Sequence, residues 1–355
     1  MKKILTVIGA RPQFIKASVV SHALAKRPDE IEEVLLHTGQ HFDANMSSIF
    51  FDQLSIPKPR FQLDIHGGTH GQMTARMLES IERIILDEKP DRVLVYGDTN
   101  STLAGALAAI KLHVPVAHIE AGLRSFNMQM PEEVNRILTD NVSDLLFCPT
   151  ETAIKNLERE GFCSKPITML NVGDVMQDAA LFFAQNASAT IESKPKGDFA
   201  LATLHRAENT DDENRLRSII NALNHIHKNI APVLLPVHPR TRAAIQRLGV
   251  ELEISVIDPV GYLEMIDLLQ SCSLVLTDSG GLQKEAFFFR KPCITMRDQT
   301  EWVELVEIKA NTLAGADEEQ IIKSARQSFG SIIQVAHSPY GEGFASEKIA
   351  SCLAK

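Results

Sequence analysis

Carboxylates follow short apolar runs at two points in the first half of this chain. The segment HIEAGLRS, residues 118–125, directly follows the apolar run 114–117 and places Glu120 where a buried strand should end. Asp98 occupies the same kind of position in VYGDTNST. A carboxylate at the end of a strand either caps the next element or points into a binding site. Both acids are therefore candidates for acid–base chemistry.

Polar groups stand at the ends of apolar runs in the second half as well. His205 follows such a run in LATLHRAEN, His238 in LLPVHPRT and Asp278 in VLTDSGG. Ligands of open parallel sheets bind beyond the carboxyl ends of the strands. The recurrence of polar groups therefore predicts a ligand site at one edge of each sheet.

Two segments have the composition of an anion site. In IGARPQFIK, Arg11 and Lys16 flank the predicted start of a helix, where a cation and free N–H groups attract anions. In TDSGGLQKEA, Ser279 is a predicted N-cap, and Gly280 and Gly281 expose backbone N–H groups. An ordinary strand-to-helix turn with a solvated arginine would also explain the first segment, and a bare Ser-Gly-Gly is weak evidence by itself.

The segment MPEEVNR has two readings. Glu132 and Arg136 are four residues apart on a predicted helix, so they can form a surface ion pair, or they can belong to an active site. Spacing alone leaves both readings open. Thr210 and Glu213 fit a capping box, which predicts a structural role for Glu213.

Overall composition excludes several classes of protein. The net charge of −9 argues against nucleic-acid or anionic-membrane binding, and no run of apolar residues is long enough to span a membrane. Five scattered cysteines without C-x-x-C spacing predict reduced thiols in a cytoplasmic protein. His37, His41 and His118 lack the spacing of a metal site, so we expect no metal. The fingerprint sequences for dinucleotide and triphosphate binding are absent.

Short β-branched runs alternate with helical patterns along the whole chain of 355 residues. This order predicts an α/β protein of two Rossmann-like domains, each a doubly wound parallel sheet, facing each other across a cleft. We expect an N-terminal domain over residues 1–171 that carries the acid–base carboxylates, and a C-terminal domain over 172–355, for which the resemblance given below implies UDP binding. The last helix, about residues 343–355, could return to the first domain.

Nine segments, read together, resemble the non-hydrolysing UDP-N-acetylglucosamine 2-epimerase family. They are GARPQFIK, HTGQHFD, VYGDTNST, HIEAGLRS, MPEEVNR, FCPTE, LHRAEN, PVHPRT and TDSGGLQKEA. The resemblance implies a fold of the glycosyltransferase-B type, a homodimer, and a UDP-sugar substrate handled without metal or NAD. It implies catalytic roles for Asp98, Glu120, Glu132, Arg136 and His205. It also implies UDP contacts by Arg11, Lys16, His238, Ser279, Gly280, Gly281 and Glu285.

Four positions depart from the commonest pattern of this family, namely Gln13, Ala207, Lys284 and Trp302. The segments GARPQFIKAS, VGDVMQDAA and RDQTEWVELVE resemble the branch that converts UDP-2,3-diacetamido-2,3-dideoxy-glucuronate to its mannuronate epimer for lipopolysaccharide O-antigen synthesis. Gln13 and Lys284 add positive charge, which would suit a sugar carboxylate, whereas the arginines absent at 207 and 302 act the other way. The alternatives are UDP-N-acetylglucosamine 2-epimerase, a glycosyltransferase of the same fold, and a non-catalytic nucleotide-sugar sensor.

Overall fold

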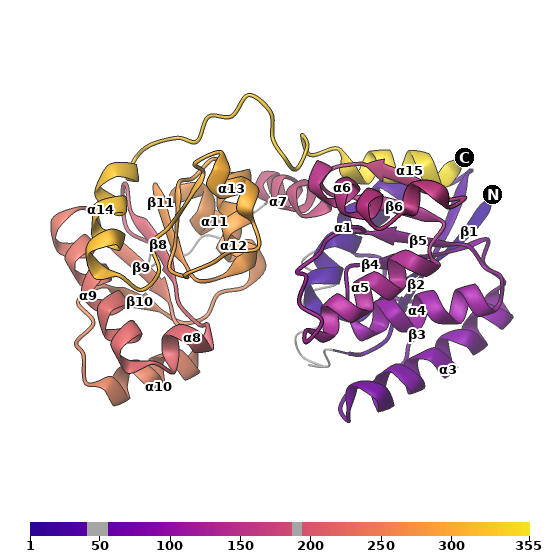
Figure 1. The fold of residues 1–355 in the computed structure, drawn as a ribbon, viewed down its shortest axis with the longest axis horizontal. Helices are drawn as coiled ribbons and strands as arrows, with labels where there is room; N and C mark the ends of the chain where they lie inside the picture. Colours follow the sequence, from indigo (N-terminus) through magenta and orange to yellow (C-terminus); the bar gives the residue numbers. More distant parts are fainter. Residues whose placement is uncertain (41–55, 187–193) are drawn as a thin grey trace. The chain divides into compact units, whose positions relative to one another are not determined.

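A computed structural model describes residues 1–40, 56–186 and 194–355 of the chain (Figure 1). The chain divides into two compact units. Unit 1 comprises residues 1–179 and 337–355, and unit 2 comprises residues 180–336. His41 and the rest of the HTGQHFD segment after Gln40 lie outside the described residues.

Unit 1 is built on a parallel sheet of seven strands in the order β3-β2-β1-β4-β5-β6-β7. The strands are β1 (Lys2–Ile8), β2 (Ile31–His37), β3 (Phe61–Gln62), β4 (Arg92–Tyr96), β5 (Val116–Ile119), β6 (Leu145–Cys148) and β7 (Thr168–Asn171). The helices are α1 (Arg11–Ala25), α3 (His70–Glu88), α4 (Asn100–Lys111), α5 (Pro131–Val142), α6 (Glu151–Arg159), the 3-10 turn η1 (Phe162–Ser164), α7 (Val175–Asn186, which continues into unit 2) and α15 (Ala345–Ala354). Helices α3, α4 and α5 pack side by side, and α15 packs on α1 (Figure 1).

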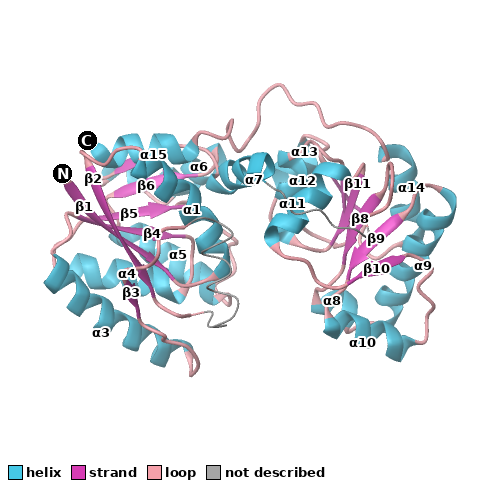
Figure 2. Ribbon diagram, turned by 180° about the vertical axis from the view of Figure 1, so that it is seen from behind, coloured by secondary structure: helices cyan, strands magenta, loops and turns pink. Residues whose placement is uncertain are grey.

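Unit 2 is built on a parallel sheet of six strands in the order β10-β9-β8-β11-β12-β13. The strands are β8 (Ala200–Thr203), β9 (Val233–Pro236), β10 (Ser255–Ile257), β11 (Leu274–Thr277), β12 (Cys293–Thr295) and β13 (Asn311–Leu313). The helices are α8 (Ala207–Thr210), α9 (Glu213–Asn229), α10 (Pro239–Leu248), α11 (Tyr262–Ser271), α12 (Gly280–Phe288), α13 (Val303–Glu307) and α14 (Glu318–Ser328). Figure 2 shows α9 and α14 on one side of this sheet and α11 and α12 on the other.

The continuous apolar runs seen in the sequence are strands that are buried on both faces. In β8, Ala200 and Ala202 pack into the core below α9 and α14. The alternate residue Leu201, with Phe199 just before the strand, packs into the core below α11 and α12. Because successive side chains of a strand point to opposite faces, both faces need apolar residues, and the sequence shows no alternation.

The structure differs from the expected elements in small ways. Strands β3 and β13, of two and three residues, were not among the expected strands. The predicted capping box at Thr210 is wrong: α9 is capped by Asp212, which accepts hydrogen bonds from the backbone N–H groups of Asn214 and Arg215. Within the described residues, no helix has both the length and the apolar character needed to cross a bilayer.

The C-terminal segment belongs to unit 1, and the break between the units falls after Ala179, later than the expected break after residue 171. A buried carboxylate fixes the start of α15. Asp178 accepts hydrogen bonds from the backbone N–H groups of Ala345 and Ser346, at 3.1 and 2.7 Å, and from the Ser346 hydroxyl.

Candidate active site

In each parallel sheet, the order in which successive strands are added reverses between two central strands, and several of the predicted site residues follow those two strands. In unit 1 the reversal falls between β1 and β4, which are followed by Arg11 and Asp98. In unit 2 it falls between β8 and β11, which are followed by His205 and Ser279. The crevice at such a reversal is where open α/β sheets bind ligands. Arg11, Asp98, His205 and Ser279 therefore follow the strands at the reversals, while Glu120 and His238 follow the neighbouring strands β5 and β9.

Glu120 lies one residue beyond β5 and is nearly buried, with 8% of its side chain exposed. Its carboxylate forms an ion pair with Lys16 of α1. Gly97, at the end of β4, lies against the same carboxylate, since a Cβ atom at Gly97 would be 3.2 Å from Glu120 Oε2. Glu120 also has a positive φ of 71°, a strained backbone conformation for a residue with a side chain. The turn after β5 thus holds this carboxylate beside the turn that carries Asp98.

Asp98 forms an ion pair with Arg136 of α5, and 29% of its side chain is exposed. Arg136 also pairs with Glu133, at 2.9 Å, so its partner on α5 is Glu133 and not the Glu132 of the surface-pair reading, one of the two left open by the spacing. Glu133 is buried and accepts hydrogen bonds from the backbone N–H groups of residues 125 and 126, both at 2.9 Å. Burial alone would raise the pKa of Glu133, but these N–H groups and Arg136 lower it. Glu132, at the start of α5, is exposed.

His118 of β5 is fully buried and joins the turn of Asp98 to helix α5. Its Nε2 atom lies 2.7 Å from the carbonyl oxygen of Gly97, and its Nδ1 atom lies 2.7 Å from the carboxylate of Asp140. The other oxygen of Asp140 accepts hydrogen bonds from the Gly122 N–H, at 3.1 Å, and from Arg124, at 2.7 Å. In the sequence, His118 was a candidate only for a metal ligand, and no pattern there predicted this network.

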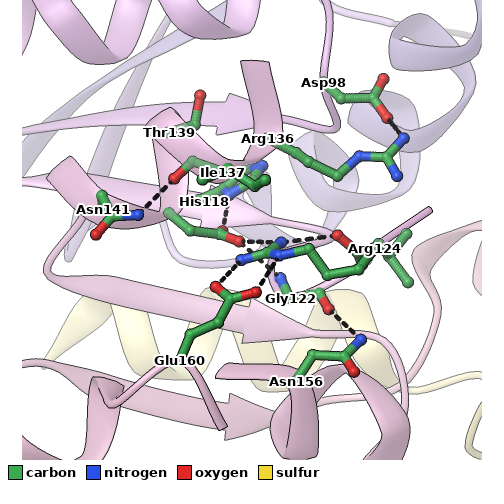
Figure 3. A network of polar contacts seen from close by, with 12 residues as sticks. Asp98, His118, Gly122, Arg124, Arg136, Ile137, Thr139, Asn141, Asn156 and Glu160 are labelled. Atoms are coloured by element: carbon green, nitrogen blue, oxygen red, sulfur yellow. Dashed lines mark hydrogen bonds and ion pairs between the residues drawn. The ribbon is translucent and has the colours of Figure 1, made fainter. Parts of the chain in front are cut away.

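Arg124 extends the network to helix α6 and the residue that follows it (Figure 3). Its guanidinium donates two hydrogen bonds to Glu160, both at 2.7 Å. Burial alone would lower the pKa of Arg124, but the carboxylates of Glu160 and Asp140 outweigh burial and raise the pKa above its usual value. Asn156 of α6 donates to the carbonyl oxygen of Gly122, at 3.0 Å. The glycine and arginine of HIEAGLRS are therefore structural supports of the turn that carries Glu120.

Gln13 has a structural role that its sequence position did not reveal. Its Oε1 atom accepts from the N–H groups of Gly9 and Ala10, at 2.8 and 3.0 Å. Its Nε2 atom donates to the carbonyl oxygen of Tyr96 and to Thr102 Oγ1, at 2.7 and 3.0 Å. A carboxylate could not make the latter two bonds, because it has no donor. Gln13 is only 2% exposed, so it ties β1 to β4 and does not serve as a charge adjustment for a substrate.

In unit 2, Asp278 holds the turn after β8. This buried carboxylate accepts hydrogen bonds from the backbone N–H groups of His205 and Arg206, at 3.0 and 2.8 Å, and lies 3.2 Å from His205 Nδ1. Burial alone would raise the pKa of Asp278, but these hydrogen bonds and the nearby imidazole lower it. About half of the His205 side chain, 49%, remains exposed and accessible to a ligand.

Helix α12 presents its N-terminus beside this turn. Ser279 is its N-cap and accepts a hydrogen bond from the N–H of Leu282. Gly280 is crowded, since a Cβ atom there would lie 2.2 Å from Glu301 Oε1, whereas Gly281 is exposed and open. Glu285 follows one turn later on the same helix. His238, the predicted UDP contact after β9, is exposed at the N-cap of α10.

Two residues that depart from the family pattern meet beside α12. The ammonium of Lys284 lies 4.3 Å from the ring centre of Trp302, which is a cation–π contact. The indole N–H of Trp302 donates to the carbonyl oxygen of Gly280, at 2.8 Å. Lys284 is buried to 6% exposure, so this cation is held close to the first turn of the helix.

The described residues contain no group of three or more His, Cys, Asp or Glu side chains placed to hold a metal ion. Burial lowers the pKa of His37 to about 4, which keeps its ring neutral near pH 7. The five cysteines are free, and burial raises the pKa of Cys272 and Cys293 to about 12. A surface hollow of about 650 Å³ in unit 2, lined by Arg215, Arg297 and their neighbours, includes none of the predicted site residues.

Comparison with known proteins identifies the family. The family model for UDP-N-acetylglucosamine 2-epimerase matches residues 22–354. The UDP-2,3-diacetamido-2,3-dideoxy-D-glucuronate 2-epimerase of Pseudomonas aeruginosa is 69% identical over 353 residues, with 99% of each chain covered. The UDP-N-acetylglucosamine 2-epimerase of Methanocaldococcus jannaschii is 42% identical, with 99% of this chain and 98% of that protein covered.

Solved structures give the same answer for the fold. The crystal structure of the M. jannaschii enzyme in complex with UDP-GlcNAc and UDP covers 99% of each chain, with a TM-score of 0.83. An epimerase from Neisseria meningitidis bound to UDP-GlcNAc covers 99% of each chain, with 31% identity and a TM-score of 0.84. The predicted fold class, two Rossmann-like α/β domains of the glycosyltransferase-B type, is confirmed. The chain belongs to the UDP-N-acetylglucosamine 2-epimerase family.

Proposed function

We propose that this protein inverts C2 of UDP-2,3-diacetamido-2,3-dideoxy-glucuronate and gives the mannuronate epimer. The observation that carries the proposal is the pair of carboxylates Asp98 and Glu120. They follow adjacent strands, lie beside the reversal point of the sheet, and each contacts its own cation. This arrangement, in a member of an epimerase family, supports acid–base chemistry on a sugar.

The chemistry explains why several carboxylates are needed. The hydrogen at C2 of a 2-acetamido sugar is not next to a carbonyl carbon, so direct deprotonation is too costly. Loss of UDP from C1 makes the C2 hydrogen acidic, and its removal leaves a glycal. Protonation of C2 from the opposite face and return of UDP to C1 then give the epimer. Groups on two faces of the ring must move protons, and carboxylates also stabilise the positively charged transition state.

Each site residue has a place in this scheme. Asp98, Glu120 and Glu132 are the proton-transfer candidates, and Arg136 positions Asp98 through their ion pair. Arg11, Lys16 and His238 are proposed to contact UDP. Ser279, Gly280 and Gly281 offer the helix N-terminus of α12 to the diphosphate, and Glu285 lies one turn further along. His205, held by Asp278, steadies the departing diphosphate.

The choice of sugar is supported by the identity of 69% to the P. aeruginosa protein. It is also supported by Lys284, which places a cation beside the first turn of α12, where a typical family member has an acidic residue. A sugar carboxylate and a second acetamido group need such polar partners. A site with buried polar partners rejects an analogue that lacks the matching groups by orders of magnitude, because those partners stay unpaired.

Two measurements test the proposal. Incubation with the diacetamido-glucuronate nucleotide in deuterated water should place deuterium at C2 without any acceptor, a result that neither a glycosyltransferase nor a sensor would give. The value of kcat/KM should be at least about a hundredfold lower for UDP-N-acetylglucosamine. Equal efficiency with the two nucleotides would return the protein to the parent activity. Chelators and added NAD should leave the rate unchanged, and loss of activity restored by one divalent metal would contradict the proposed scheme.

We also infer that the protein is a homodimer that supplies lipopolysaccharide O-antigen synthesis. Leu86 and Ile110 are exposed apolar residues on the neighbouring helices α3 and α4, which supports contact with a second copy. Sedimentation equilibrium should then give about twice the chain mass of 39.2 kDa. A mass equal to that of one chain would exclude the dimer.

A further inference from the structure

The strongest unexplained feature of unit 1 is the fully buried pair of His118 and Asp140. Both residues are polar, yet both are wholly buried, so the filling of an apolar core does not explain their presence. Buried ionisable groups of this kind cost stability unless they are paired and hydrogen-bonded. Their bonds lead to the two turns that carry the proposed catalytic carboxylates.

The hydrogen bonds fix where the protons are. The carbonyl oxygen of Gly97 can only accept, so His118 Nε2 must carry a hydrogen. Nδ1 and Asp140 Oδ1, 2.7 Å apart, share a second hydrogen. The other oxygen of Asp140 accepts from Arg124 and from the Gly122 N–H, which favours the carboxylate form. The second hydrogen therefore lies between Nδ1 and Asp140, and the ring donates to Gly97 from Nε2.

We propose that His118 and Asp140 are positioning residues that lock the turns of Asp98 and Glu120 in register with each other. The Nε2 donor fixes the carbonyl of Gly97, the residue before Asp98. Asp140 fixes the N–H of Gly122, two residues after Glu120. The N–H of Gly97 in turn donates to Ile119, the residue before Glu120, at 2.9 Å. The pair of His118 and Asp140 thus joins both turns. This inference rests on the proposed function.

Other charged groups face the pair and are part of its balance. Arg124 and Glu160 complete an alternating row of charges with Asp140 and His118 (Figure 3). Cys148 of β6 interacts electrostatically with both Asp140 and Arg124. Burial raises the pKa of its thiol, so the thiol stays neutral. The ion pair of Lys16 and Glu120 lies on the other side of Gly97.

Two substitutions at one position separate the two bonds. His118→Gln offers an amide N–H near the position of Nε2 and can keep the bond to Gly97. His118→Asn offers one near Nδ1 and leaves the Gly97 carbonyl without a donor. We expect kcat to fall about tenfold in His118→Gln and about a hundredfold in His118→Asn, because small misplacements of reacting groups cost that much. KM should change less than about twofold in both, since the nucleotide contacts are untouched.

Ser143→Ala is the matched control. The Ser143 hydroxyl is buried just after α5 and bonds only within that region, to the Thr139 carbonyl at 2.7 Å. Its loss should lower Tm as much as the His118 changes do, without the fall in kcat. Equal kcat in His118→Asn, His118→Gln and Ser143→Ala would overturn the positioning role. The role would also be overturned if kcat fell as much in Ser143→Ala as in His118→Asn.

Two readouts need no substrate and so remain decisive if the proposed function fails. In the full-length protein with 15N-labelled histidine, the His118 ring, assigned by its loss in His118→Gln, should carry a hydrogen on Nε2. The amide of Gly97 should exchange with deuterated water faster in His118→Asn than in His118→Gln. An Nε2 atom without hydrogen, or equal exchange in both variants, would overturn the inference. Absence of deuterium at C2 in the wild-type reaction would instead overturn the proposed function.

Discussion

The two units share one topology but build their sites in different ways. Unit 1 presents side chains that are fixed by other side chains, as Lys16 fixes Glu120 and Arg136 fixes Asp98. Unit 2 presents the backbone of a helix N-terminus, and its buried Asp278 holds backbone N–H groups. Proton transfer requires a titratable atom in a defined place, whereas a diphosphate is bound well by oriented N–H groups. The difference supports the proposal that unit 1 carries the proton-transfer groups and that unit 2 supplies most of the UDP contacts, beside Arg11 and Lys16 of unit 1.

The largest expected effect tests the chemical half of this comparison. Asp98→Asn, Glu120→Gln and Glu132→Gln should each lower turnover by at least about a hundredfold, the scale of losing a general acid or base. UDP affinity, measured by calorimetry, should stay within about threefold of wild type if the nucleotide is held by unit 2. The exposed Glu79→Gln is the control and should match wild type. Near-normal turnover in all three variants would remove the mechanism.

A smaller effect tests the binding half. Gly280→Ala places a methyl group on the first turn of α12, where it meets Glu301. We expect KM for the nucleotide to rise about tenfold with little change in kcat, because uniform binding is lost and not transition-state stabilisation. Gly71→Ala, at an open helical position in unit 1, is the control. A fall in kcat without a rise in KM would show that the units do not divide the work in this way.

The smallest effect concerns stability in acid. Hydrogen bonds lower the pKa of Asp278 in unit 2 and of Glu133 in unit 1 below their unfolded values, despite burial. A lowered pKa means that the stabilisation is complete above the unfolded values of 3.8 and 4.5 and is lost as pH falls below them. Urea unfolding between pH 6 and pH 3 should therefore show a smaller loss in Asp278→Asn and in Glu133→Gln than in wild type. Parallel curves for all three proteins would contradict these assignments.

The sequence predicted the positions of the site residues better than their contacts. Asp98 and Glu120 could be placed at strand ends because β-branched runs mark parallel strands and their carboxyl ends share an edge. The partners of these acids come from distant segments: Lys16 from α1 and Arg136 from α5. Spacing suggested Glu132 for Arg136, but the structure gives Glu133, because the helix turns that residue toward residues 125 and 126.

Structural supports of the site were missed because their sequence signal is ordinary. Gln13 looked like a charge difference at the substrate, whereas its bonds join the turn after β1 to the end of β4 and the start of α4, and they depend on how those strands pair. His118 sits inside an apolar run, and this placement was its only clue, since a wholly buried strand has little use for an imidazole. Asp140, its partner, follows 22 residues later on a helix, and no local pattern connects the two.

The chain enters unit 1 twice, and this has a consequence for biosynthesis. Unit 2 is one uninterrupted stretch, residues 180–336, while unit 1 lacks α15 until residues 337–355 have been made. The ribosome therefore completes the proposed nucleotide-binding unit before it reaches the segment that closes unit 1. Until then, the carboxylate of Asp178 lacks the N–H groups of α15 that it accepts hydrogen bonds from. The face of α1 that α15 covers is also open to chaperones or to other nascent chains.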